Sequence, residues 1–173
     1  MGIEVIIEKY NHHWITQYEN EKTNILNAIG DFIIDIQHIG STAIPGLGAK
    51  PIIDMMAGVS HLNGFNKFID PLHLLDYEYV PKQEVIDRKF FRKGRWRQGT
   101  VHLHICEYKS NEWKEKLLFR DFLRAHPNKR DEYFELKKKL ASKFKFDRPA
   151  YTAAKTNFIN DIIKLACLRY NIK

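Results

Sequence analysis

The sequence predicts an α+β protein, in which a mixed β-sheet packs against helices and a C-terminal segment of about three helices follows. Short isoleucine-rich runs dominate residues 1–110, whereas residues 111–173 carry helical patterns separated by proline. A series of strands followed by a series of helices is typical of the α+β class. The 173 residues, 44% of them hydrophobic, suit one core. We therefore expect a single domain with a sheet-rich half (1–110) and a helical half (111–173).

In the sheet-rich half, apolar runs bounded by turn residues predict the strands. These are residues 3–7, 32–39, 51–59, 77–80, 89–92 and 100–107. Residues 12–29 carry apolar side chains at helical spacing, with Asn11 as the N-cap and Gly30 as the stop. A shorter helix is expected over 61–75, broken near Pro71.

In the helical half, three helices are expected at 111–126, 129–145 and 149–170. Pro127 and Asn128 separate the first two. The residues Asp147-Arg148-Pro149 are of the types that begin a helix, so they open the third.

The net charge indicates which binding partners the protein favours, and its two cysteines indicate its cellular compartment. The formal net charge of +7 favours an anionic partner, namely a nucleotide or another phosphorylated small molecule, with nucleic acid less favoured. The two cysteines, Cys106 and Cys167, lie far apart and form no C-x-x-C pair, as expected of a reduced cytoplasmic protein. No apolar run approaches the roughly 20 residues that span a bilayer, and no signal peptide is evident.

The most informative stretch runs from His38 to Asp54, HIGSTAIPGLGAKPIID. A Gly40-Ser41 turn that leaves a strand permits close approach of a phosphate group. The next strand then delivers the carboxylate of Asp54, which could hold a divalent cation that bridges those phosphates. The competing interpretation is a tight Pro/Gly turn that binds no ligand.

This stretch, extended to HIGSTAIPGLGAKPIIDMM, resembles the signature of the GrpB family, whose usual form is close to HIGSTSVPGLAAKPIIDI. Further motifs resemble the family in the expected order: Tyr10-Asn11-His12-His13-Trp14, His102-Leu103-His104, FRDFLRAHP at 119–127 and Tyr151-Thr152-Ala153-Ala154-Lys155. The resemblance covers nearly the whole chain and implies a nucleotidyltransferase-like fold. Family members also occur fused to a dephospho-coenzyme A kinase domain, which hints at coenzyme A metabolism.

The sequence lacks the second of the catalytic acids that nucleotidyltransferases usually carry. Active nucleotidyltransferases usually present a second acid two residues after the first, so that two metal ions clamp the reacting oxygens. Here Met55 and Met56 follow Asp54. The expected replacement is the pair His102 and His104, which share one face of a strand, about 7 Å apart at their Cα atoms. With Asp54 they would form a catalytic site for Mg, Mn or Zn; alternatively they are strand histidines bonded to neighbours.

The basic stretch RKFFRKGRWR, residues 88–97, combines six cations and three aromatic residues. It could contact a triphosphate or a nucleic acid, with Trp96 stacking on a base, or form a hairpin with a solvated cationic face. In a hairpin, Arg88 and Arg92 are the cations best placed to reach the cleft. The residues we expect to bind phosphate are Gly40, Ser41, Thr42, Lys50, Arg88, Arg92 and Lys155.

Other polar residues have structural interpretations. The triplet Lys137-Lys138-Lys139 is predicted to be a solvated helix face. Arg120 and Arg124 share a helix face and are expected to form structural ion pairs. His38 is expected to bind a metal or to position the loop, and Cys106 should share the face of the histidine pair.

These residues predict a nucleotidyltransferase-like protein that binds a nucleotide or a phosphorylated metabolite together with a divalent metal. The missing second carboxylate favours an alternative, a catalytically degenerate module that binds a nucleotide or a coenzyme A-related molecule. A third class, an RNA-binding accessory protein, rests only on the basic stretch.

Overall fold

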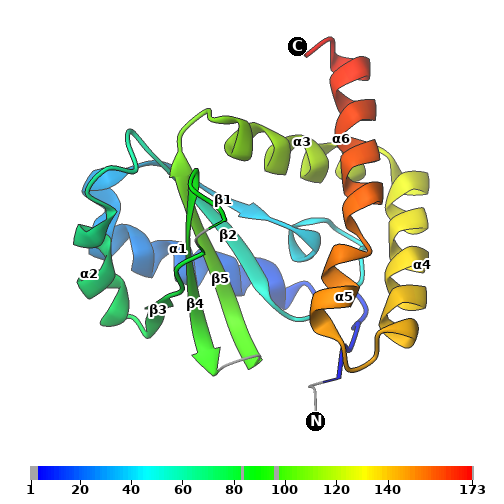
Figure 1. Ribbon diagram of the computed structural model, residues 1–173, viewed down its shortest axis with the longest axis horizontal. Helices are drawn as coiled ribbons and strands as arrows, with labels where there is room; N and C mark the ends of the chain where they lie inside the picture. The colour runs from blue at the N-terminus through cyan, green and yellow to red at the C-terminus, as the bar shows by residue number, and fades with distance from the viewer. Residues whose placement is uncertain (1–3, 83, 96–97, 173) are drawn as a thin grey trace.

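The computed structural model describes residues 4–82, 84–95 and 98–172 and contains a mixed five-stranded sheet (Figure 1). The strands are β1 (Ile33–Ile39), β2 (Ile53–Val59), β3 (Tyr77–Tyr79), β4 (Arg88–Arg95) and β5 (Gln98–Glu107). Their spatial order is β1-β2-β5-β4-β3, and β2 and β5 run parallel while the other neighbours are antiparallel. The predicted mixed sheet and five of the six predicted strands are thereby confirmed.

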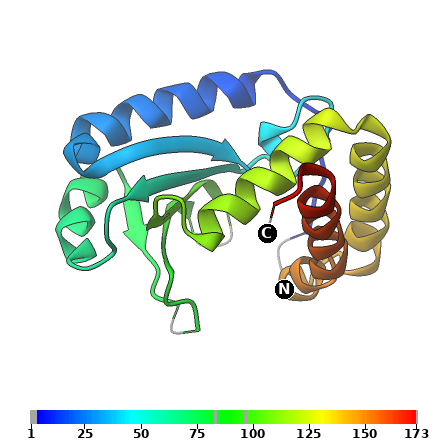
Figure 2. The ribbon, with the colours of Figure 1, turned by 90° about the horizontal axis from the view of Figure 1, so that it is seen from above.

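Helices cover both faces of the sheet and also pack beyond one of its ends. They are α1 (His13–Ile29), α2 (Ile69–His73), α3 (Asn111–Ala125), α4 (Pro127–Lys143), α5 (Arg148–Ala153) and α6 (Thr156–Tyr170). Figure 2 shows α1 on one face, α3 across the other, and α4 to α6 stacked beyond one end. No helix in the described ranges is long and apolar enough to cross a membrane.

Alternation along the central strands divides their side chains between two environments. On one face, residues such as Met55 of β2 and Leu103 of β5 are buried in a core with Trp14 and Ile25 of α1 and Leu72 of α2. A second core forms among the C-terminal helices, and it includes two residues from the loop between β1 and β2.

Those two loop residues are Ile44 and Leu47, which are fully buried against Phe122 and Leu123 of α3 and Ile162 of α6. The loop after β1 is therefore anchored in the helical half and not only in the sheet. This anchoring brings the helical half beside the Gly40-Ser41 turn.

The strand predicted at residues 3–7 is wrong over the part that the structure describes. Residues 4–7 form no strand, and the amide of Val5 donates to the carbonyl of Lys145 at 2.8 Å. Glu8 makes one isolated bridge to Ala49. The apolar pattern reflects burial of Val5 against the helical half, which the sequence cannot distinguish from burial in a sheet.

Two helix predictions also need correction. Pro71 does not break α2, because it lies in the first helical turn, where no intrahelical bond needs its missing N–H. The single helix expected over 149–170 is split into α5 and α6. Between them the amide of Lys155 donates to Thr152, three residues back, which tightens the turn and ends α5.

Candidate active site

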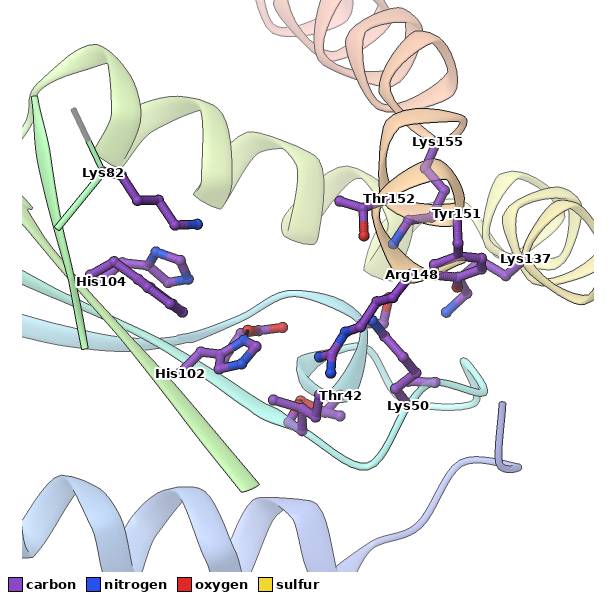
Figure 3. Close-up of a pocket in the computed structure, with 15 residues that line it drawn as sticks. Thr42, Lys50, Lys82, His102, His104, Lys137, Arg148, Tyr151, Thr152 and Lys155 are labelled. Atoms are coloured by element: carbon purple, nitrogen blue, oxygen red, sulfur yellow. Dashed lines mark hydrogen bonds and ion pairs between the residues drawn. The ribbon is translucent and has the colours of Figure 1, made fainter. Parts of the chain in front are cut away.

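A cavity of about 320 Å³ lies between the sheet and the C-terminal helices (Figure 3). Its lining residues are Ser41, Thr42, Ala49, Lys50, Ile52, Asp54, Lys82, Phe90, His102, His104, Lys137, Arg148, Tyr151, Thr152 and Lys155. We call it the central cavity. Four lysines and one arginine surround Asp54, the one carboxylate in this lining. Such an excess of positive side chains fits an anionic ligand.

Asp54 and His102 form the polar pair on the sheet side of the cavity. The parallel register places Asp54 of β2 beside His102 of β5, and Oδ1 lies 3.1 Å from Nδ1. Burial alone would raise the pKa of the Asp54 carboxyl, but the hydrogen bond and charge of His102 lower it to about 2. An ionised carboxylate can only accept, so Nδ1 of His102 donates. In the neutral ring, Nε2 is then left as a proton acceptor or a metal ligand.

His104 lies two residues further along β5, on the same face, as the spacing predicts. Burial, with a further contribution from Arg88, lowers the pKa of His104 well below its ordinary value. Its ring lies 5.1 Å from the ring of Phe90 between centroids. Its Nδ1 is buried without a hydrogen-bond partner among the described residues. His104 is therefore a neutral imidazole in the wall of the cavity.

Gly40 is required by the close approach of the loop to Asp54. Its φ is +69°, and a Cβ at this position would lie 2.7 Å from Oδ2 of Asp54. Any larger residue would have both a strained backbone and a collision with the carboxylate. Ser41 follows in the lining of the central cavity, and it lines an adjoining cavity together with Tyr133.

Cationic side chains of α3 and α4 donate hydrogen bonds to backbone carbonyl groups of this loop and of the end of β1. Arg120 donates to the carbonyl of His38, Arg124 to that of Ala43, Arg130 to that of Pro45 and Lys137 to that of Gly48. Arg120 also pairs with Asp121 at 2.7 Å. The structural role predicted for Arg120 and Arg124 is confirmed, and it consists mainly of fixing the loop.

His38, at the end of β1, and Thr42, within the loop, position the loop through their side chains. Burial lowers the pKa of His38 to about 4, so the ring is neutral, and it stacks on Tyr18 with centroids 4.7 Å apart. The hydroxyl of Thr42 donates to the carbonyl of Ile52 at 3.3 Å and lies 2.9 Å from Nε2 of His38. The described contacts of Thr42 thus hold the loop against the start of β2.

Three lysines on the helix side share one small volume. Burial and neighbouring cations lower the pKa of Lys50 and of Lys137 to about 7. Burial likewise lowers the pKa of Lys155 to about 8. The ammonium groups of Lys50 and Lys155 lie 5.2 and 4.4 Å from the ring centroid of the buried Tyr151. A bound anion would relieve their mutual repulsion.

The residues predicted to bind phosphate do not all lie in the central cavity. Ser41, Thr42, Lys50 and Lys155 lie together in the central cavity, and Gly40 lies in the lining of an adjoining one. Arg88 is outside all of these linings and pairs with Glu112 at 2.6 Å. Arg92 lines a second adjoining cavity and pairs with Glu78 at 2.7 Å. Trp96 falls outside the described residues.

The prediction that Lys137 belongs to a solvated face is wrong. It is 2% exposed and lines the central cavity, whereas Lys138 and Lys139 are exposed. Sequence reasoning also missed Lys82 and Arg148. Lys137 lies four residues after the buried Tyr133, a spacing that places both on one helix face and could have identified it.

The predicted three-residue metal site is not assembled as such. Among the residues that the structure describes, no three His, Cys, Asp or Glu side chains are grouped closely enough to hold a metal ion. Asp54 is engaged with His102, and Met56, where a second acid would stand, is buried against Ile39, Cys106 and Trp113. Cys106 lies on the predicted face but in this packed region, and burial raises the pKa of its thiol to about 11.

Two further cavities adjoin the central one. The first, of about 560 Å³, shares Lys82, Phe90, His102, Arg148 and Thr152 with it and lies between β4 and α5. The second, of about 400 Å³, shares Ser41, Asp54, His104, Thr152 and Lys155 and lies between α3 and α6. We call them the α5 cavity and the α3/α6 cavity.

Known proteins are similar to this chain in sequence and in fold. Residues 4–165 match the family described as GrpB protein. The glutamate-rich protein GrpB of Alkalihalophilus pseudofirmus is 36% identical over 164 residues, covering 92% of this chain and 94% of that protein. The crystal structure of conserved protein GrpB from Enterococcus faecalis superposes with a TM-score of 0.88 at 31% identity, covering 95% of this chain and 99% of that chain.

More distant similarities extend beyond these relatives. A dephospho-CoA kinase of Mycolicibacterium paratuberculosis is 25% identical over 179 residues, covering 88% of this chain and 44% of that protein. The structure of the GLD-2/RNP-8 complex matches with a TM-score of 0.57 at 10% identity, covering 87% of this chain and 60% of that chain, which indicates a similar fold. The chain belongs to the GrpB family.

Proposed function

We propose that this chain is a nucleotidyltransferase-like protein that binds the phosphates of a nucleotide or a phosphorylated metabolite in the central cavity. The observation that carries the proposal is the charge of the lining, in which four lysines and one arginine surround a single carboxylate. Charge-assisted hydrogen bonds from such groups to phosphate oxygens are among the strongest available to proteins.

The sheet side of the cavity supports a catalytic role. Asp54 fixes the ring of His102 through Nδ1, so that Nε2 can accept a proton from an attacking hydroxyl group. Gly40 and Ser41 bring the loop within contact of Asp54, next to the phosphate position. In this proposal Asp54 and His102 serve the reacting groups, while Lys50, Lys137, Arg148 and Lys155 hold the phosphates.

The proposal includes a divalent cation, for which Asp54 is the main candidate ligand. Magnesium in phosphate sites is commonly held by one or two carboxylates, and substrate phosphates supply further oxygens. The ionised Asp54 borders the cavity and offers one such ligand. His102 and His104 are additional candidates for zinc or manganese. The bound metal would polarise a phosphoryl oxygen.

The second candidate is a binding module without turnover. Met56 stands where the second acid would, and it is buried in an apolar cluster with Ile39, Cys106 and Trp113. The similarity to a dephospho-CoA kinase makes a coenzyme A-related molecule a candidate ligand.

Calorimetric titration with ATP, dephospho-coenzyme A and inorganic tripolyphosphate, in magnesium buffer, tests the proposal. We expect binding that weakens in Lys155→Met and persists in Lys164→Met, which removes an exposed lysine of α6. Absence of binding by all three would refute a phosphate site. Chromatography of the recovered ligand then separates the two candidates, since conversion requires a transferase and an unchanged ligand indicates a binding module.

A further inference from the structure

The α5 cavity is chemically unlike the central cavity to which it is joined. Its volume is about 560 Å³, and most of its lining surface is apolar, with Val80, Phe90, Pro149 and Ala153 among the residues that line it. Three cationic residues, Lys82, Arg92 and Arg148, also line it. Ligand sites of 300–1,000 Å³ commonly combine an apolar lining with a few fixed polar groups. The α5 cavity has this composition beside a strongly cationic neighbour.

The boundary between the two cavities is formed by residues that belong to both. Lys82, from the segment before β4, and Arg148, from α5, line both cavities and lie on opposite sides of the central one (Figure 3). Phe90 lies on the same boundary, with its ring centroid 5.1 Å from that of His102. Because these residues line both cavities, the α5 cavity lies directly beside the central one, within reach of a ligand whose phosphates fill the central cavity.

We propose that the α5 cavity binds the base of a nucleotide whose phosphates occupy the central cavity. This inference rests on the proposed phosphate site and adds the substrate class. A planar, uncharged base fits a lining of Phe90, Val80 and Pro149, and aromatic rings stabilise bases by stacking. The planar guanidinium of Arg148 borders the same space.

The α3/α6 cavity is the less suitable compartment for a base. Its lining combines apolar side chains such as Phe119 and Ile163 with the carboxylates of Glu115 and Asp54, Lys116 and Asn160, and polar atoms make up a larger share of it than in the α5 cavity. These charged and hydrogen-bonding groups would lose water if a flat apolar surface covered them. The geometry therefore assigns the base to the α5 cavity.

Two tryptophan substitutions at exposed helix positions provide a matched test. Ala153→Trp places an indole in the α5 cavity, and Asn160→Trp places one in the α3/α6 cavity. The affinities of ATP and of inorganic tripolyphosphate are measured by calorimetry for the wild type and both variants. Circular dichroism and urea unfolding confirm that each variant is folded.

We expect the wild type to bind ATP at least about tenfold more tightly than tripolyphosphate, because one stacked base contributes that much. Ala153→Trp should remove this difference and leave tripolyphosphate binding unchanged within about twofold. Asn160→Trp should leave both affinities unchanged. The assignment is overturned if ATP and tripolyphosphate bind the wild type equally, or if Asn160→Trp alone removes the difference. If tripolyphosphate does not bind the wild type, the proposed phosphate site itself has failed.

Discussion

The central cavity has two walls, and the two halves of the chain build them differently. Asp54, His102 and His104 form the sheet wall, where strand register fixes their relative positions. Lys137, Arg148 and Lys155 form the helix wall together with the ring of Tyr151. The sheet wall presents a carboxylate–imidazole pair that can move a proton, and the helix wall presents positive charge. If the proposed function is correct, mutations in the two walls should therefore separate catalysis from ligand binding.

The largest expected effect concerns the helix wall. Lys137→Met should weaken tripolyphosphate binding by about 30- to 100-fold, because one charge-assisted contact contributes roughly 2–3 kcal/mol. Lys139→Met, two residues away and exposed, should change the affinity by less than about twofold. Calorimetry measures both. Equal losses would mean that general surface charge, and not the cavity, attracts the ligand.

The next effect concerns the loop behind the sheet wall. Gly40→Ala should destabilise the fold by about 2–3 kcal/mol, because it combines left-handed strain with a collision against Asp54. Gly64 has a φ of +76°, but a Cβ added there would meet nothing within 4 Å, so Gly64→Ala should cost only about 1 kcal/mol. Urea unfolding compares the two. Similar costs would show that the contact with Asp54 contributes nothing.

A smaller effect is expected from pH. The pKa of Lys137 is lowered to about 7 in the folded protein, against 10.5 ordinarily, so the unfolded chain binds more protons between these values. Stability of the ligand-free protein should therefore rise with pH from about 7 to about 10, as urea titrations can measure.

Ligand affinity should move in the opposite direction. A polyphosphate favours the protonated lysine, so its affinity should fall by about tenfold more in the wild type than in Lys137→Met between pH 7 and 9. Titration of the ligand itself is common to both proteins and cancels in this difference. If the affinities of the two proteins changed with pH in parallel, protonation of Lys137 would not contribute to ligand binding.

The smallest effect distinguishes the walls most directly. Asp54→Asn removes a negative charge from the phosphate site, so metal-free tripolyphosphate binding in EDTA should tighten by a few-fold. Any additional affinity that magnesium gives the wild type should disappear in this variant. Weaker binding in EDTA would place Asp54 among the ligand-holding groups and remove the division between the walls.

The sheet wall could be predicted from sequence because it depends on local patterns. The run HIGSTAIPGLGAKPIID gives a strand, a Gly-Ser turn and a second strand, and alternation places His102 and His104 on one face. Which strands become neighbours is not local. The 3.1 Å contact between Asp54 and His102 follows from the parallel pairing of β2 with β5, which the sequence alone did not reveal.

The helix wall was harder to predict for a physical reason. Lysine and arginine usually lie at the surface, so Lys137 and Arg148 resemble ordinary solvated cations in sequence. The burial of Lys137 and the position of Arg148 in the cavity lining depend on how α4 and α5 pack near the loop that contains Gly48. The break between α5 and α6 at Lys155 likewise arises from tertiary packing, since no glycine or proline marks it.

The parallel pairing of β2 with β5 also has a consequence for how the protein folds. Asp54 and His102 are 48 residues apart, and the chain between them forms α2, β3 and β4. Closing so long a loop costs entropy before any contact compensates for it, which makes such pairings slow to form. A nascent chain that has formed only β1 and β2 holds Asp54 without its imidazole partner. Ligand binding should therefore be one of the last properties that the folding protein acquires.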